Sequence, residues 1–221
     1  MEAYEISRGL AFIGFTRKIL ERENNKADEG ARQLYFQLQP PQGILGVNRN
    51  ILVDVDECGV WLAVCRRKYG HAPSGQSAST RAPYNVGKKY TVILAIDLGG
   101  VLCYCITDSP GTTSEIWYQF LFDLLLPAIH GQQRVILMDN LAAHNDPAAR
   151  ALVANDGHTI VKRPAYSGDL GSIELANNVF KMQLKRDWHV LTESNLPAYI
   201  EASLCMIKAH QCVGFFRHTG H

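Results

Sequence analysis

Two apolar runs that each end in an acidic residue constrain the fold of this chain most. In Asn50–Glu57, apolar and acidic residues alternate, which is typical of a strand and places Asp54 and Asp56 on the same face. Arg134–Asn140 contains a continuous apolar run, typical of a buried strand, with Asp139 at its carboxyl end. Each strand therefore delivers an acid to a position where metal ligands are common.

A third acid, Glu174, follows Asp139 after an interval of 34 residues, 140–173. Tyr166–Glu174 is a turn-rich loop, and Leu175–Trp188 continues with apolar residues at helical spacing, so Glu174 is predicted in the first turn of a helix. Mg²⁺ prefers oxygen ligands and is usually held by one or two carboxylates, so three converging acids can carry a metal pair suited to in-line displacement at phosphate. Taken singly, each acid is more simply explained as a solvated or capping carboxylate.

Four segments carry a family likeness. Val55–Val60 holds the first acid in a strand, and Arg66–Gly75 is basic and contains glycine and proline. Met138–His144 has an Asp-Asn pair followed by a histidine four residues later, and Arg163–Glu174 ends in the third acid. In this order, and with the interval of 34 residues, these segments resemble the mariner-type branch of the DDE transposases. The likeness extends from about residue 9 to residue 221.

The resemblance implies an α/β, ribonuclease H-like fold with a mixed five-stranded sheet flanked by helices. It implies a metal-dependent DNA endonuclease and strand transferase that cleaves DNA and integrates a transposable element. Asp56, Asp139 and Glu174 would be catalytic and would bind two Mg²⁺ ions, for which Mn²⁺ can substitute. Asn140 and His144 would support them. The implied partners are DNA, at the element ends and at the target, and a second copy in a homodimer, without a membrane. The implied location is the nucleus of a eukaryotic host, and an intracellular, non-secreted protein is expected.

Two departures from the family pattern leave a second function open. The family's Ser-Pro-Asp-Leu-Asn-Pro-Ile-Glu is Ser167-Gly-Asp-Leu-Gly-Ser-Ile-Glu174 here. Gly171 and Ser172 can still cap the helix, but they stiffen the loop less than asparagine and proline would. Residues 1–45 resemble only the end of an N-terminal helix-turn-helix region and its linker, joined to a catalytic domain at 46–221. The alternative is therefore a catalytically inactive or domesticated transposase remnant with at most non-specific DNA binding.

Another nuclease of the same fold, such as a ribonuclease H or a junction resolvase, fits the Asp-Asn-x-x-x-His motif and the interval before Glu174 less well.

The net charge of +1 is low for a protein that binds DNA with its whole surface, so DNA contacts are expected from local basic patches. The candidate patches are Arg66, Arg67 and Lys68; Arg81, Lys88 and Lys89; Lys162 and Arg163; and Lys181 and Lys185. The last two share one face of the predicted helix with Glu174 and Asn178 and would bind phosphate beside the metal ligand. A solvated helix surface explains these lysines equally well.

The remaining sequence predicts the rest of the architecture. Strands are expected at Lys89–Leu98, Val101–Thr107 and His158–Lys162, helices at Ser114–Ile129, Pro147–Asn155 and Leu196–Lys208, and a long loop at Gly70–Gly87. Gly99-Gly100 is a hairpin signal. The six cysteines show no C-x-x-C pair and are expected to be free thiols. Several acids have simpler expected roles: Asp54 as a supporting or surface acid, Asp97 in a turn, Asp146 as a helix cap and Asp169 within its loop.

Overall fold

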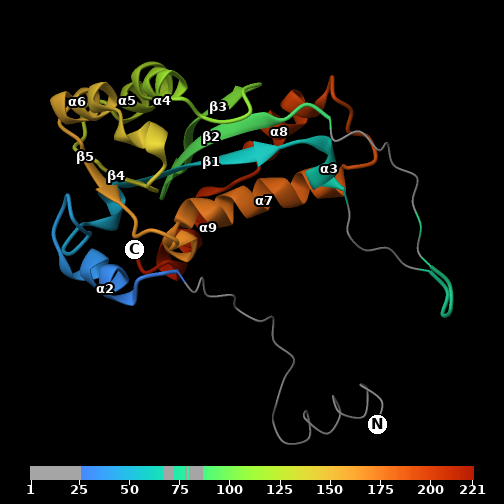
Figure 1. Cartoon of the computed structure of the whole chain (residues 1–221), viewed down its shortest axis with the longest axis horizontal. Helices are drawn as coiled ribbons and strands as arrows, with labels where there is room; N and C mark the ends of the chain where they lie inside the picture. Colours follow the sequence, from blue (N-terminus) through green and yellow to red (C-terminus); the bar gives the residue numbers. More distant parts are fainter. Residues whose placement is uncertain (1–25, 67–71, 78, 80–86) are drawn as a thin grey trace, which may run out of the picture.

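The computed structural model describes residues 26–66, 72–77, 79 and 87–221 (Figure 1). Its centre is a five-stranded sheet in the order β3-β2-β1-β4-β5. The strands are β1 (Leu52–Val60), β2 (Tyr90–Asp97), β3 (Gly100–Thr107), β4 (Val135–Met138) and β5 (Thr159–Lys162). The first three are antiparallel neighbours, whereas β4 is parallel to β1 and to β5. The predicted mixed five-stranded sheet is confirmed.

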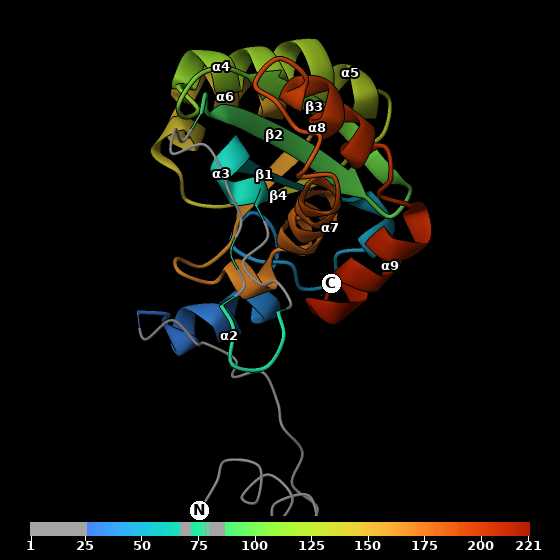
Figure 2. The ribbon, with the colours of Figure 1, turned by 90° about the vertical axis from the view of Figure 1, so that its right-hand side faces the viewer.

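Helices cover both faces of this sheet (Figures 1 and 2). On one face lie α4 (Ser114–Phe120), a π-helical turn (Leu121–Leu125), α5 (Leu126–Ile129) and α6 (Pro147–Asn155). On the other lie α7 (Ser172–Arg186), α8 (Leu196–Leu204) and α9 (Ala209–His218), with α2 (Glu29–Gln37) and the short α3 (Leu62–Cys65). Short 3₁₀ turns occupy Arg49–Ile51, Ala142–Asn145 and Gly168–Leu170. Among the described residues, no helix has the length and apolar character needed to cross a membrane.

Successive residues of β1 pack into two separate cores, because side chains of a strand alternate between the faces of a sheet. Val53 and Val55 belong to the core beneath α4 and α6. Leu52 and Cys58 belong to the core beneath α7. Asp54 and Asp56 share this second face with Leu52 and Cys58, whereas Glu57 faces the α4 side.

The structure differs from the sequence prediction at several places, among them the turn after β2 and the chain after Leu204. The hairpin turn between β2 and β3 consists of Leu98 and Gly99, because Gly100 already pairs with Asp97. The Asp97 carboxylate accepts a hydrogen bond from the Gly99 amide at 2.7 Å, which confirms its role in the turn. The last predicted helix ends at Leu204, and α9, which the sequence analysis did not predict, follows it.

The described part of the N-terminal segment packs against the sheet domain. Tyr35 of α2 is 1% exposed, and it belongs with Ile44 to the core beneath α7. Residues 1–25 lie outside the described part of the chain, and so does most of the predicted Gly70–Gly87 loop. The domain boundary between residues 45 and 46 therefore stays a prediction.

Candidate active site

Parallel pairing of β1 with β4 brings the first two candidate acids together. The pairing sets Leu52 beside Val135 and Asp54 beside Leu137. Asp56 lies two residues beyond Asp54 and Asp139 lies two residues beyond Leu137, and the two acids are close enough for their charges to interact. The two acids therefore lie near the carboxyl end of β4, on the face of the sheet that α7 covers. Asp139 directly follows β4, as predicted, whereas β1 continues beyond Asp56 to Val60, so Asp56 lies within its strand and not at its end.

The third acid, Glu174, comes from the start of α7. The helix begins at Ser172, so Glu174 is in its first turn, as predicted. Gly171 occupies the N-cap position and has no side chain with which to cap. The Asp54 carboxylate performs this function from β1, because its Oδ2 accepts a hydrogen bond from the Ile173 amide at 3.1 Å. The helix that carries Glu174 is thereby attached to the strand that carries Asp56.

The three carboxylates are also close enough for their charges to interact. Burial raises the pKa of Asp56 to about 7; the charge of Arg163 lowers it, and the charges of Glu174 and Asp139 raise it further. Asp56 is only 9% exposed. A buried carboxylate that is held among other negative charges is stabilised by a cation.

Asp54 and Arg163 form a buried ion pair behind the three acids, with Arg163 Nη1 donating to Asp54 Oδ1. Asp54 is 0% exposed and Arg163 is 4% exposed. The prediction that Arg163 belongs to a DNA-binding surface patch is therefore wrong, and Asp54 is a supporting acid and not a surface acid. Neither burial could be read from the sequence, because the two residues are 109 positions apart.

Asn140 supports the site through the backbone. Its Nδ2 donates a hydrogen bond to the Arg163 carbonyl at 2.8 Å, and the Arg163 amide donates to the Met138 carbonyl at 2.8 Å. These bonds join the ends of β4 and β5 next to Asp139.

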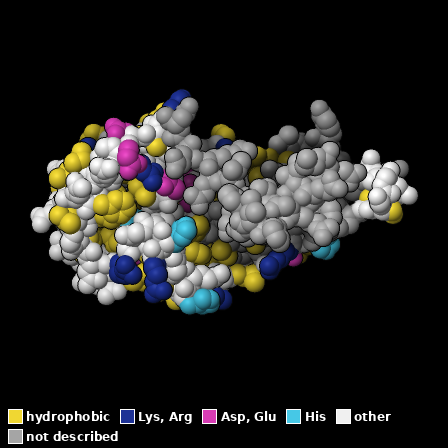
Figure 3. Space-filling model, turned by 90° about the horizontal axis from the view of Figure 1, so that it is seen from below, with side chains coloured by type: hydrophobic (Ala, Val, Ile, Leu, Met, Phe, Trp, Pro, Cys, Tyr) yellow, Lys and Arg dark blue, Asp and Glu magenta, His cyan; other side chains and the backbone are white. Residues whose placement is uncertain are grey.

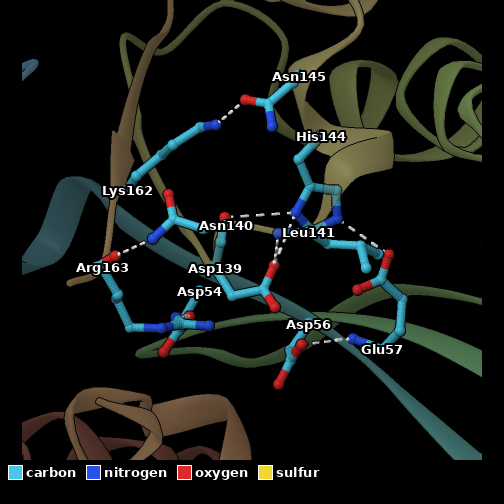
Figure 4. Close-up of polar contacts among 10 residues, drawn as sticks. All are labelled: Asp54, Asp56, Glu57, Asp139, Asn140, Leu141, His144, Asn145, Lys162 and Arg163. Atoms are coloured by element: carbon cyan, nitrogen blue, oxygen red, sulfur yellow. Dashed lines mark hydrogen bonds and ion pairs between the residues drawn. The ribbon is translucent and has the colours of Figure 1, made fainter. Parts of the chain in front are cut away.

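The His144 ring, on the α4 side of the sheet, lies between the carboxylates of Asp139 and Glu57 (Figure 4). Its Nδ1 is 2.9 Å from Asp139 Oδ1, and its Nε2 is 2.9 Å from Glu57 Oε1. Carboxylate oxygens accept hydrogen bonds, so both ring nitrogens donate and the ring is an imidazolium. Burial opposes this charge, but the hydrogen bonds to Asp139 and Glu57 raise the pKa of His144 to about 9. The ring also lies against Trp117, with 4.2 Å between the ring centroids.

Glu57 is a functional candidate that sequence reasoning missed. The sequence does contain a signal for this role. Because side chains alternate along a strand, Glu57 points away from Asp56 and towards the face on which Trp117 and His144 lie. Glu57, Asp139 and His144 bring ligand-type atoms within 4.8 Å of one another. Both ring nitrogens of His144 are already at hydrogen-bond distance from carboxylates, so we assign this group as a hydrogen-bonded network.

Each aspartate has one carboxylate oxygen anchored by the protein. Asp139 Oδ1 accepts from the Leu141 amide at 2.9 Å as well as from His144, and Asp56 Oδ1 accepts from the Glu57 amide at 2.8 Å. Burial acts against ionisation of Asp139, but the hydrogen bonds from His144 and Leu141 hold its pKa below the usual value. Within the described part of the chain, Oδ2 of each aspartate has no hydrogen-bond partner. Two pre-oriented carboxylates with free oxygens, next to Glu174, fit the all-oxygen coordination that Mg²⁺ and Mn²⁺ favour.

The candidate DNA-binding residues differ in their exposure and in their partners. Lys181 is half-buried and Lys185 is exposed on α7, on the same side as the exposed Glu174. Lys88 is instead paired with Asp108 at 2.8 Å, and Lys89 donates to the Pro110 carbonyl at 2.8 Å. Arg66 lies just after α3, whereas the structure does not describe Arg67, Lys68 and Arg81. In the described part of the face drawn in Figure 3, Lys and Arg side chains form small separate groups and not one continuous basic surface.

Comparison with known proteins agrees with this geometry. The family model described as DDE superfamily endonuclease matches residues 52–196. The Mos1 transposase paired-end complex with the left transposon end has a TM-score of 0.67 at 17% identity, over 98% of this chain and 66% of that chain. The Mos1 mariner paired-end complex with Mn has a TM-score of 0.70 at 16% identity, with the same coverage. The catalytic domain of Mos1 mariner transposase has a TM-score of 0.58 at 13% identity, over 92% of this chain and 91% of that chain. No curated protein sequence matches the chain.

These comparisons settle the fold and the family. The chain spans 66% of the length of the Mos1 transposase chain in the paired-end complexes. The likeness to those structures confirms the predicted ribonuclease H-like arrangement of a mixed sheet between helices. The family model covers more than half of the chain, and it includes Asp56, Asp139 and Glu174, so the protein belongs to the DDE superfamily endonuclease family.

Proposed function

We propose that this chain is the catalytic part of a mariner-type DDE transposase, which cuts DNA at the ends of a transposable element and joins it to a target. The observation that carries the proposal is the convergence of Asp56, Asp139 and Glu174 on the α7 face of the sheet, where their charges interact, in a chain of an endonuclease family. The same fold occurs in Mos1 transposase bound to a transposon end.

Asp56, Asp139 and Glu174 would hold two divalent cations, Mg²⁺ or Mn²⁺. When bound, such a pair supplies activation of the attacking hydroxyl and stabilisation of the leaving oxygen in an in-line displacement. The similar Mos1 structures include a paired-end complex with Mn and a paired-end complex with Mg. The free Oδ2 atoms of the two aspartates and the lowered pKa of Asp139 support this assignment.

The protein's own residues position the substrate and balance its charge. Water attacks a phosphodiester at the element end and breaks the bond to the 3′ oxygen, which leaves a free 3′-hydroxyl. That hydroxyl then attacks a phosphodiester of the target and displaces another 3′ oxygen, so no covalent protein–DNA intermediate is needed. Lys181 and Lys185 are suited to binding the flanking phosphates because they lie along the helix that carries Glu174, and Arg66 is a further candidate.

The partners follow from the same proposal. DNA at the element ends and at the target is the substrate, and a second copy of the chain would hold the other element end in a homodimer. The related Mos1 structures include a paired-end complex and a strand-transfer complex, which supports this proposal. A reaction on chromosomal DNA would take place in the nucleus.

The test is nicking of supercoiled plasmid by purified protein with Mg²⁺ or Mn²⁺, beside an Asp139→Asn variant of equal thermal stability. Nicking that needs the metal and disappears in the variant is the expected result. Absence of nicking by folded protein that still binds plasmid would favour the alternative, an inactive or domesticated remnant. Faster cutting of an RNA–DNA hybrid than of plasmid would point to a ribonuclease H.

A further inference from the structure

The segment that delivers Glu174 is held by three parts of the chain that are distant from it in sequence. We define this segment, residues 167–174, as the glutamate loop. We propose that contacts from α2, from β1 and from residues 219–221 position Glu174, in place of the local stiffness that prolines would give. This inference rests on the proposed function, because it assigns positioning residues to the same site.

The first contact comes from α2. Arg32 Nη1 donates to Asp169 Oδ1 at 2.8 Å, and Arg32 Nη2 donates to Asp169 Oδ2 at 2.6 Å. Two parallel bonds from one guanidinium fix both the distance and the orientation of the carboxylate. The helix that carries Arg32 is itself anchored, because Tyr35 is 1% exposed in the core.

The second set of contacts comes from residues 219–221. His221 Nε2 donates to the Leu170 carbonyl at 2.9 Å, and the hydroxyls of Thr219 and Ser172 are 2.7 Å apart. All three side chains are buried: His221 and Thr219 are each 5% exposed, and Ser172 is 0% exposed. The His221 ring also lies close to the ring of Tyr35, at 6.0 Å between centroids, so this contact set joins the one from α2.

The third contact comes from β1, where Asp54 Oδ2 accepts from the Ile173 amide at 3.1 Å. The glutamate loop is therefore fixed at Asp169, Leu170, Ser172 and Ile173, immediately before Glu174. Local sequence contributes little, because Gly171 carries no capping side chain and the Ser172 hydroxyl is used by Thr219. Tertiary contacts at four of the five residues that precede Glu174 indicate a loop whose geometry is set from outside.

The experiment removes the contacts while keeping side-chain shape where it is buried. The triple variant Asp169→Ala, Thr219→Val and His221→Phe deletes the polar contacts from α2 and from residues 219–221, and phenylalanine keeps the ring packing. The matched control is Tyr104→Phe, which deletes a 2.7 Å bond to Glu201 between β3 and α8, away from the loop.

A compensating change, Ser172→Pro, restores local stiffness within the triple variant. Ser172 is the first residue of α7, a position that proline favours. The preceding Gly171 has φ −90° and ψ 110°, an extended conformation that suits a residue before proline.

Two quantities are measured: hydrogen exchange of a peptide covering residues 167–174, and the Mn²⁺ concentration that half-saturates a thermal shift. In the triple variant we expect faster exchange in this peptide and a roughly tenfold higher half-saturating Mn²⁺ concentration, as for other residues that orient metal ligands. Tyr104→Phe should change neither quantity, and Ser172→Pro should restore both.

The proposal is overturned if the triple variant matches wild type in both quantities, or if Ser172→Pro leaves its defects unchanged. Should the triple variant not fold, Asp169→Ala alone, at an exposed residue, gives the same comparison with smaller changes. If wild-type protein shows no Mn²⁺ response, the proposed function fails, and the exchange comparison with the compensating change still decides the role of the contacts.

Discussion

At the scale of single residues, the network of Glu57, His144 and Asp139 makes Glu57 a positioning residue. The Glu57 carboxylate holds the protonated ring of His144, and that ring holds Asp139 Oδ1. Replacing Glu57 with glutamine keeps the size of the side chain and removes the charge that stabilises the imidazolium. Loss of a residue that orients a metal ligand usually weakens metal binding by about 10–100-fold.

We therefore expect E57Q to need a correspondingly higher Mn²⁺ concentration for half-maximal plasmid nicking, with plasmid binding unchanged. The matched control is E115Q, which makes the same chemical change at an exposed position of α4. Equal Mn²⁺ requirements in the two variants would show that Glu57 does not act on Asp139.

A second residue-scale prediction concerns the pH dependence that Asp56 gives to metal-free protein. Burial raises the pKa of Asp56 in the folded state to about 7, above its value of 3.8 in an unfolded chain. The folded state then holds the proton more tightly, so ionisation of Asp56 destabilises the fold increasingly as the pH rises from about 4 through 7. Each unit of difference between the folded-state and unfolded-state pKa corresponds to about 1.4 kcal/mol in the free energy of unfolding.

D56N removes this cost and should raise the free energy of unfolding of metal-free protein by roughly 1–3 kcal/mol at pH 8, and by less at pH 5. Urea unfolding at the two pH values measures the difference, with D123N as a control at an exposed acid. A destabilised D56N at pH 8 would mean that the ionised carboxylate is well compensated without a cation.

At the scale of secondary-structure elements, the Asp54–Arg163 pair ties β1 to the end of β5 and to the start of α7. Removing one member of a buried ion pair leaves the other charge without compensation and usually costs about 3–5 kcal/mol. D54N should therefore destabilise the protein by about this amount, because Arg163 is 4% exposed. The double variant D54N/R163M, which removes both charges, should be less destabilised than D54N in the same urea titration. Equal or greater loss in the double variant would show that the pair contributes through packing and not through charge.

The elements that carry the site could be predicted because their sequence patterns are strong. The alternation in β1, the apolar run of β4 and the helical spacing in α7 predicted the strand that holds Asp56, the position of Asp139 after β4 and the first-turn position of Glu174, although β1 continues to Val60. The helix α9 was missed because its buried residues are only Cys212 and Phe216, with Gly214 between them. Pairs such as Asp54 with Arg163, or Arg32 with Asp169, could not be predicted, because a charged side chain usually indicates a surface and its partner is distant in sequence.

At the scale of the whole molecule, the charge is too small for the surface as a whole to bind DNA strongly. The net charge is +1, and the basic side chains in Figure 3 lie in separate groups. Affinity should therefore depend on a few local cations, of which Lys181 and Lys185 lie beside the candidate site. Each lysine that neutralises a phosphate of duplex DNA contributes about 0.9 to the slope of log affinity against log salt concentration.

K181Q/K185Q should weaken plasmid binding and reduce this salt slope by up to about 1.8, since two phosphate contacts are lost. The control K208Q/R217Q makes the same change in net charge on α9 and its N-terminal flank, so it should leave the slope nearly unchanged. Fluorescence anisotropy of a labelled duplex across a salt series measures both variants. Because the two variants have the same net charge, equal slopes would mean that DNA responds to the total charge of the molecule and that α7 is not the DNA-binding surface.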